Sequence, residues 1–243
     1  MDFVTIVEWA TVVVTFVMIG SGSPICINMY KQKSTRNVPY LLFLISAFVS
    51  TVSLQYGLVI KNSVLILINV VAVLVWGLYI SVYILVSKSK TLPLVKLMSV
   101  VLLYWGHLLY LESVPKKDVI STLGVFLIVW CVVAYLIPAL DILTMVREKS
   151  AASCDLSLLL GGTLSASVWY LYGVLVEDVN IYLPCIIGLV VSGIKFFLML
   201  LYRSGPKKST TTEFSKVRGG DKATEFHEEV YRVSSRDGLR QRM

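Results

Sequence analysis

Apolar stretches of about 20 residues recur along most of the chain, and they constrain its fold more than any other feature. A helix of about 20 apolar residues crosses a bilayer core of about 30 Å. Of the 243 residues, 56% are hydrophobic and 15% are charged, which excludes a disordered chain and an ordinary soluble domain. The sequence therefore predicts an all-α integral membrane protein. Its seven spans are expected at about 4–29, 38–60, 64–87, 94–111, 119–146, 156–176 and 180–202.

The start of the first span does not resemble a secretory signal. The chain begins Met1-Asp2-Phe3 with no basic segment, and the apolar run is longer than a signal core. We therefore predict a retained helix.

The basic residues gather in alternate loops. This distribution is typical of the cytoplasmic side of a membrane protein. It argues against nucleic-acid binding as the reason for the net charge of +7. It predicts an outward N-terminus and a cytoplasmic C-terminus. Lys195, inside the last span, is expected to extend its ammonium toward the basic side. The basic residues of these loops and helix ends are Lys31, Lys33, Arg36, Lys88, Lys90, Lys96, Arg147 and Lys149.

An internal repeat appears when the chain is shifted by 116 residues without a gap. The matching pairs are Met29 with Met145, Lys33-Ser34 with Lys149-Ser150, Tyr56-Gly57 with Tyr172-Gly173, and Gly77 with Gly193. Each copy is a unit of three helices, and one span is left between the copies. That odd span gives both copies the same orientation, as two parallel three-helix bundles joined by a linker helix (3+1+3). Such duplicated bundles place a transport path between their halves, with a binding site near the midplane.

The repeat also sets the predicted domain boundaries. The first three-helix repeat is expected at 1–87, the linker helix and its loops at 88–118, and the second repeat at 119–203. Residues 204–243 are polar and charged, and we predict a disordered cytoplasmic tail.

Asn69 and Trp169 are the candidate binding residues that stand out inside the spans. An intramembrane amide either joins helices or recognises a ligand, and a tryptophan either faces lipid or lines a path. The 116-residue shift pairs Asn69 with Cys185 and Trp169 with Ser53, so the four would face each other across a two-fold axis. An indole face with one or two amides suits a sugar, whose C–H face packs on the ring while its hydroxyls form hydrogen bonds.

Other polar and breaker residues suggest hinges. Pro24, Pro39 and Pro138 lie in or near helix ends, and Pro138 is the best hinge candidate because it is deep in its helix. Asp141 could carry a proton in a coupled transporter, or form a hydrogen bond or gate contact near the cytoplasmic side. His107 is expected to be structural.

Nothing in the sequence forms a catalytic constellation, so no enzyme activity, cofactor or metal site is predicted. The cysteines Cys26, Cys131, Cys154 and Cys185 are expected to be small buried residues rather than disulfides or ligands.

Several segments together, in this order and spacing, resemble the SWEET sugar transporter family over residues 4 to about 203. They are "SPICINMYKQKST", "VPYLLFLISAF", "INVVAVLVWGLYIS", "IPALDILTMVREKS" and "SASVWYLYG". The resemblance implies facilitated, bidirectional uniport of mono- or disaccharides by alternating access, and an animal-type member. It implies a substrate pocket at Ser53, Asn69, Trp169 and Cys185, where Cys185 replaces an expected second asparagine.

The resemblance also bears on the hinges. In the family's set of four prolines, Pro39 and Pro138 match, whereas Gly22, with Pro24 two residues later, and Asp155 replace the other two. Asp155 suggests a cytoplasmic gate that closes through charge or hydrogen bonds.

The expected partners are a sugar and the lipid bilayer, with no nucleic acid, and a homo-oligomer is expected from the family. The plasma membrane is the expected location, with the Golgi apparatus as the alternative. Two other functions stay open from the sequence. One is a proton-linked exporter of amino acids, and the other is a non-transporting adaptor or receptor acting through residues 204–243.

Overall fold

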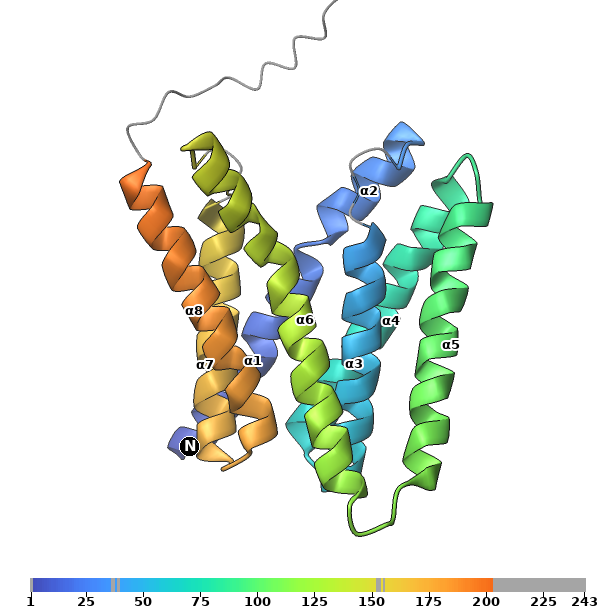
Figure 1. Cartoon of the computed structure of the whole chain (residues 1–243), viewed down its shortest axis with the longest axis vertical. Helices are drawn as coiled ribbons and strands as arrows, with labels where there is room; N and C mark the ends of the chain where they lie inside the picture. Colours follow the sequence, from blue (N-terminus) through green and yellow to red (C-terminus); the bar gives the residue numbers. More distant parts are fainter. Residues whose placement is uncertain (1, 36–37, 39, 152–153, 155, 203–243) are drawn as a thin grey trace, which may run out of the picture. The chain divides into compact units, whose positions relative to one another are not determined.

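The computed structural model describes residues 2–35, 38, 40–151, 154 and 156–202. Two predicted gate residues, Pro39 and Asp155, and the whole predicted tail, 204–243, therefore lie outside the described residues. The described part is helical, with no strand. Its helices are α1 (Phe3–Gly20), α2 (Ser23–Gln32), α3 (Tyr40–Ile60), α4 (Ser63–Val86), α5 (Thr91–Ser113), α6 (Val119–Glu148), α7 (Leu156–Leu175) and α8 (Val179–Leu201) (Figure 1).

The seven predicted spans are confirmed as helices long and apolar enough to cross a membrane, with α1 and α2 together forming the first. The first span is interrupted near the predicted hinge residues Gly22 and Pro24, because α1 ends at Gly20 and α2 begins at Ser23. Pro24 lies in the first turn of α2 and has no backbone N–H to continue the hydrogen bonds of α1.

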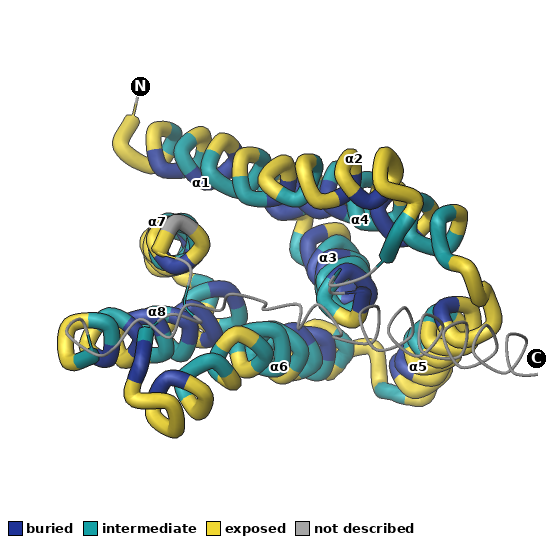
Figure 2. Tube along the Cα trace, turned by 90° about the horizontal axis from the view of Figure 1, so that it is seen from above, coloured by how far each residue is buried: buried dark blue, intermediate teal, exposed yellow. Residues whose placement is uncertain are grey.

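The helices pack in two groups with the same internal order. In the first, α4 contacts α1, α2 and α3; in the second, α8 contacts α6 and α7. The groups meet where α1 packs on α7 and α3 packs on α6, and these two contacts exchange under the 116-residue shift. Helix α5 packs at the edge against α3 and α6 (Figure 2). Below, the first half means residues 3–86 and the second half residues 119–201.

The turns repeat as closely as the helices. Lys33 and Lys149 both take left-handed backbone angles, with φ of 48° and 47°, and Lys61 and Glu177 do the same, with φ of 59° and 57°. After Tyr56 and Tyr172 the backbone closes in the same way, since Asn62 N donates to Gly57 O at 2.9 Å and Asp178 N donates to Gly173 O at 3.0 Å.

At Gly173 the absence of a side chain permits the close approach of α8 after this turn. A Cβ at Gly173 would lie 2.7 Å from the backbone nitrogen of Tyr182, too close for any side chain. The end of the molecule that carries these two turns is called the turn end. The opposite end, with the loops at Lys33, Lys88 and Lys149, is called the basic end.

Buried apolar packing joins the two halves mainly toward the turn end. One core cluster there combines side chains of both halves, among them Val52, Tyr56 and Leu65 from the first and Leu127, Tyr172 and Ile181 from the second. A second cluster, around Phe43, Leu44 and Tyr79, belongs to the first half and lies nearer the basic end. In Figure 1 the helices of the two halves diverge toward the basic end.

Candidate functional site

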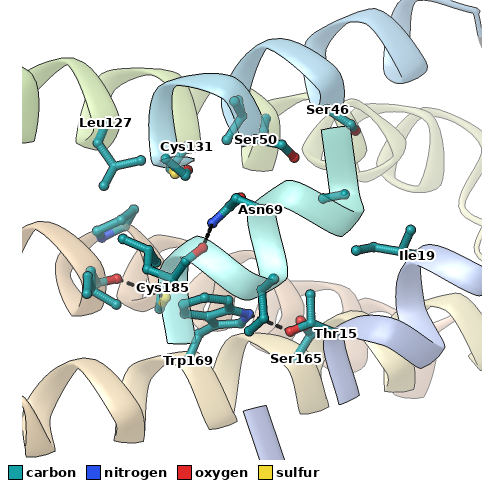
Figure 3. A pocket seen from close by; sticks show the side chains of 18 of the residues that line it. Thr15, Ile19, Ser46, Ser50, Asn69, Leu127, Cys131, Ser165, Trp169 and Cys185 are labelled. Carbon is teal, nitrogen blue, oxygen red and sulfur yellow. Dashed lines mark hydrogen bonds between the residues drawn. The ribbon is translucent and has the colours of Figure 1, made fainter. Parts of the chain in front are cut away.

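A cavity of about 310 Å³ lies between the two halves. Helices α1, α3 and α4 supply one wall, and α6, α7 and α8 supply the other. All four predicted binding residues, Ser53, Asn69, Trp169 and Cys185, line it, and Figure 3 shows three of them close together. The structure thus brings the four positions to one place, and Trp169 lines a cavity instead of facing only lipid.

The lining follows the 116-residue shift, so the cavity lies on the axis that relates the halves. Seven pairs of equivalent residues contribute to it. They are Thr15 and Cys131, Ile19 and Tyr135, Val49 and Ser165, Ser53 and Trp169, Leu65 and Ile181, Ile68 and Pro184, and Asn69 and Cys185.

Asn69 and Cys185 differ in what they can offer a ligand. Asn69 Nδ2 donates to Leu65 O at 2.8 Å, and Cys185 Sγ donates at 3.2 Å to Ile181 O, the equivalent carbonyl. After this bond the amide keeps one N–H and its carbonyl oxygen, whereas the thiol has no proton left to give. Of these two equivalent residues, only Asn69 therefore offers an amide to a polar ligand.

Trp169 is held by a hydrogen bond that crosses between the halves. Its Nε1 donates to Thr15 Oγ1 at 2.9 Å, and its ring meets Tyr172 edge-on, with centroids 6.0 Å apart. This contact fixes the orientation of the indole beside Asn69 and Cys185 (Figure 3).

The hydroxyl groups of the cavity are available to a ligand. Many serines and threonines in the spans donate to the carbonyl four residues earlier, as Thr51 does to Ala47 O at 2.8 Å. The side chains of Ser46, Ser50, Ser53 and Ser165 line the cavity and form no hydrogen bond with the described residues. Three of them lie on one face of α3, at spacings of four and three residues.

Two tyrosines close the cavity at the turn end. Tyr56 Oη donates to Asp178 Oδ2 at 2.8 Å and receives a bond from Asn180 Nδ2 at 2.8 Å. The equivalent Tyr172 Oη donates to Asn62 Oδ1 at 2.8 Å. Each bond joins the second helix of one half to the N-terminal cap of the third helix of the other.

Comparison with known proteins identifies the origin of this architecture. The family model described as "Sugar efflux transporter for intercellular exchange" matches the chain twice, at residues 5–91 and 121–207. The chain belongs to this family. The match confirms the SWEET family that the sequence motifs predicted.

Relatives from animals and plants cover most of the chain. "Sugar transporter SWEET1" of Xenopus laevis is 28% identical over 85% of this chain and 96% of its own length. The human protein of the same name is 29% identical over 82% of this chain and 90% of its own length. "Bidirectional sugar transporter N3" of Medicago truncatula is 30% identical over 76% of this chain and 71% of its own length.

A solved structure of a eukaryotic SWEET transporter shares the fold. It superposes with a TM-score of 0.72 at 20% identity, over 83% of this chain and 97% of that one. Together with the seven apolar helices, the relatives show an integral, multi-pass membrane protein.

Sequence reasoning missed the hydrogen bonds that close this SWEET-family cavity. The repeat already paired Tyr56 with Tyr172. It also pairs their bonding partners, because Asn62 and Asp178 are 116 residues apart and each caps the N-terminus of the third helix of its half. A polar cap at equivalent positions, next to the Tyr-Gly turns, is the signal that could have found them.

The predicted hinge residues of the first half lie at the break between α1 and α2. Gly22 packs against Tyr79, since a Cβ at Gly22 would lie 2.7 Å from the Tyr79 ring. Tyr79 Oη donates at 3.2 Å to Ile19 O, a carbonyl at the break, and lies 2.8 Å from Ser23 Oγ.

In the second half, α6 runs through Pro138 without a break. Three residues later, Asp141 Oδ2 forms an ion pair with Lys195 Nζ at 2.8 Å. Lys195 was expected to extend its ammonium toward the basic side; its side chain is only 7% exposed and ends on Asp141. An ammonium inside a span is stabilised by such a partner.

His107 links the linker helix to the first half. Its Nε2 lies 3.1 Å from Gln55 Oε1, and its ring packs edge-on against Phe126. It lies outside the cavity lining, in keeping with the structural role expected for it.

Proposed function

We propose that this protein is a sugar uniporter that works by alternating access between its two halves. The observation that carries the proposal is the cavity itself. It lies between the halves, holds an indole, an amide and unpartnered hydroxyls, and is closed at the turn end by hydrogen bonds across the halves. The family and the names of its relatives support a sugar as the substrate.

A sugar ring fits the chemistry of the two walls. Its C–H face packs on the Trp169 indole, while its hydroxyls bond to Asn69 and to the serines of α3. The wall formed by Leu127, Ile181 and Cys185 offers little hydrogen bonding and covers an apolar edge of the ring. Substrate recognition thus combines polar groups of the first half with an aromatic face of the second.

The structure corresponds to a state closed at the turn end. A transport cycle breaks the bonds of Tyr56 and Tyr172, opens that end and closes the basic end. The loop charges support a cytoplasmic basic end and an outward N-terminus. The plasma membrane is the proposed location, with the Golgi apparatus as the alternative, and a homo-oligomer remains an expectation from the family.

Uptake of labelled glucose and sucrose in cells that lack their own sugar uptake tests the function. We expect the wild type to equilibrate at least one of the two sugars without an imposed proton gradient. Trp169→Ala should lower uptake at least tenfold at equal surface expression, whereas Trp105→Ala, which removes an exposed tryptophan of α5, should not. Wild-type cells that take up neither sugar would overturn the proposal.

No observation favours a second function. The carboxylate suggested for proton transport, Asp141, is engaged by Lys195. An adaptor acting through the tail gives no reason for an amide, an indole and unpartnered hydroxyls in a shared cavity.

A further inference from the structure

A second tryptophan lines the same cavity at another depth. Trp76 of α4 belongs to the lining together with Trp169 of α7. Trp169 lies six residues from the turn end of its helix and Trp76 thirteen residues from the turn end of α4. At 1.5 Å per residue the two levels differ by about 10 Å along the helices, with Trp76 nearer the basic end.

The orientation of Trp76 is fixed by an aromatic cluster. Its ring meets Tyr79 edge-on, with centroids 5.6 Å apart, and lies 5.9 Å from Phe43. Tyr79 is itself held by its bond to Ile19 O. A side chain held in this way presents a rigid face, as a stacking platform requires.

Hydroxyls accompany Trp76 as they accompany Trp169. Ser46 and Ser50 lie on the face of α3 that carries Phe43, the residue that contacts Trp76. At 1.5 Å per residue, Ser46 lies near the level of Trp76, and Ser50 lies about 6 Å nearer the turn end, between the levels of Trp76 and Trp169. The Ser50 side chain is 8% exposed and lines the cavity, yet no described residue bonds to its hydroxyl. The Ser50 hydroxyl is therefore free to bond to a group inside the cavity.

The second half has no equivalent of this arrangement. The 116-residue shift pairs Trp76 with Ser192, and Ser46 and Ser50 with Gly162 and Ala166. At these three positions the tryptophan and the pair of serines are therefore found on the first half alone.

We propose that Trp76, Ser46 and Ser50 form a second sugar subsite, on the way from Trp169 to the basic end. The ligand is a pyranose ring of the transported sugar, with its C–H face on the Trp76 indole and its hydroxyls on the two serines. The inference rests on the proposed function. It adds that a sugar leaving Trp169 toward the basic end is held again before it is released.

Tryptophan fluorescence of the purified full chain separates the two subsites. Titration with glucose and with sucrose is compared among wild type, Trp169→Phe, Trp76→Phe and the double variant. We expect Trp169→Phe to keep a saturable, sugar-dependent change that the double variant loses. If Trp169→Phe removes the whole change for a sugar that the wild type transports, the second subsite does not exist.

Transport kinetics give an independent test, because a variant that merely folds less well would not change the half-saturating sugar concentration on one side of the membrane only. Trp76→Leu should raise the half-saturating concentration for sugar presented at the basic end by about three- to tenfold. Uptake from the turn end should keep its half-saturating concentration. Ser50→Ala should act in the same direction with a smaller effect. The controls are Trp105→Leu and Ser99→Ala, an exposed serine that donates to Val95 O.

The outcomes distinguish this inference from the proposed function. A wild type that transports neither sugar contradicts the function. A transporting wild type with equal basic-end kinetics in Trp76→Leu, Ser50→Ala and the controls contradicts only the subsite.

Discussion

The two halves share the same arrangement of helices, but near the basic end different side-chain contacts hold the third helix of each half. Gly22 of the first half corresponds to Pro138 of the second. The glycine lies at a helix break, and Tyr79 covers a carbonyl there; the proline lies inside a continuous helix. The residue equivalent to Tyr79 is Lys195, which binds Asp141. One half therefore fixes its third helix with a neutral hydroxyl and the other with an ion pair.

The same division of roles appears in the cavity. The first half supplies Asn69 and three unpartnered serines. The second supplies Trp169, the thiol of Cys185, one unpartnered serine, Ser165, and Asn180, whose amide donates to Tyr56. The duplicated frame places Asn69 and Cys185, and likewise Ser53 and Trp169, at equivalent positions, and divergence of single residues gives each pair different chemistry. Substitutions at positions where the two halves differ test whether these differences matter for stability and transport.

The ion pair of the second half should show the largest effect. Asp141→Asn leaves the Lys195 ammonium buried without a partner, which costs about 3–5 kcal/mol of stability. Lys195→Met should cost less, because Asp141 is 45% exposed. The double variant, without either charge, should recover most of the loss. Thermal unfolding of the purified protein measures all three.

Glu148→Gln, on the same helix but exposed, is the control for a lost carboxylate. In the first half, Tyr79→Phe removes a neutral hydrogen bond and should cost only about 1 kcal/mol. Equal unfolding temperatures for Asp141→Asn and the wild type would show that the ion pair does not stabilise the second half.

The closure at the turn end should show the next largest effect, and it should be unequal. Tyr56 bonds to a carboxylate and Tyr172 to an amide, and hydrogen bonds to charged groups contribute about 1.5–3 kcal/mol against about 1 for neutral ones. Tyr56→Phe should therefore open the turn end more than Tyr172→Phe. Labelling of the cavity thiols Cys131 and Cys185 by an impermeant maleimide added at the turn end measures this opening.

Tyr110→Phe, at an exposed tyrosine of α5, controls for a lost hydroxyl. Peptide mapping separates the cavity thiols from the other cysteines. Equal increases in labelling in Tyr56→Phe and Tyr172→Phe would contradict the predicted difference between the two bonds. Labelling that stays at the wild-type level in both variants would show that these bonds do not keep the turn end closed.

Much of the fold was predictable because membrane insertion and duplication leave strong sequence patterns. Length and apolarity gave the spans, and the 116-residue shift paired Asn69 with Cys185 before any contact was known. A hinge was expected at Gly22 and Pro24, but the part of Tyr79 was not, because that side chain lies 57 positions after the glycine and reaches the break only through tertiary packing.

Cross-half contacts were the main part of the site that sequence could not give. The bond from Tyr56 to Asp178 depends on how closely two helices approach, and no local pattern encodes that approach. The partner of Lys195 was hidden for the same reason. Trp76 was overlooked because its equivalent is an ordinary serine, so the repeat gave it no signal.

Replacing the thiol of the cavity should strengthen sugar binding. Cys185→Asn gives the second half the N–H and carbonyl that Asn69 keeps free in the first, worth about 1 kcal/mol, or about a fivefold lower half-saturating concentration. Cys185→Ser is the matched control, since its hydroxyl can replace the thiol bond to Ile181 O without adding an amide. The reverse change, Asn69→Cys, should weaken binding. A Cys185→Asn variant with wild-type or weaker affinity would contradict the assigned asymmetry.

The bond between Thr15 and Trp169 should show the smallest effect, because it positions the indole without touching the sugar. Thr15→Val keeps the shape but removes the acceptor of the Trp169 N–H, so we expect the half-saturating concentration to rise about two- to threefold. Thr15→Ser should restore the wild-type value. Thr11→Val, one turn away on α1, is the control, because Thr11 bonds only to Val7 O of its own helix. If Thr15→Ser and Thr15→Val transport alike, the hydrogen bond across the halves has no part in placing the indole, and packing against Tyr172 alone holds it.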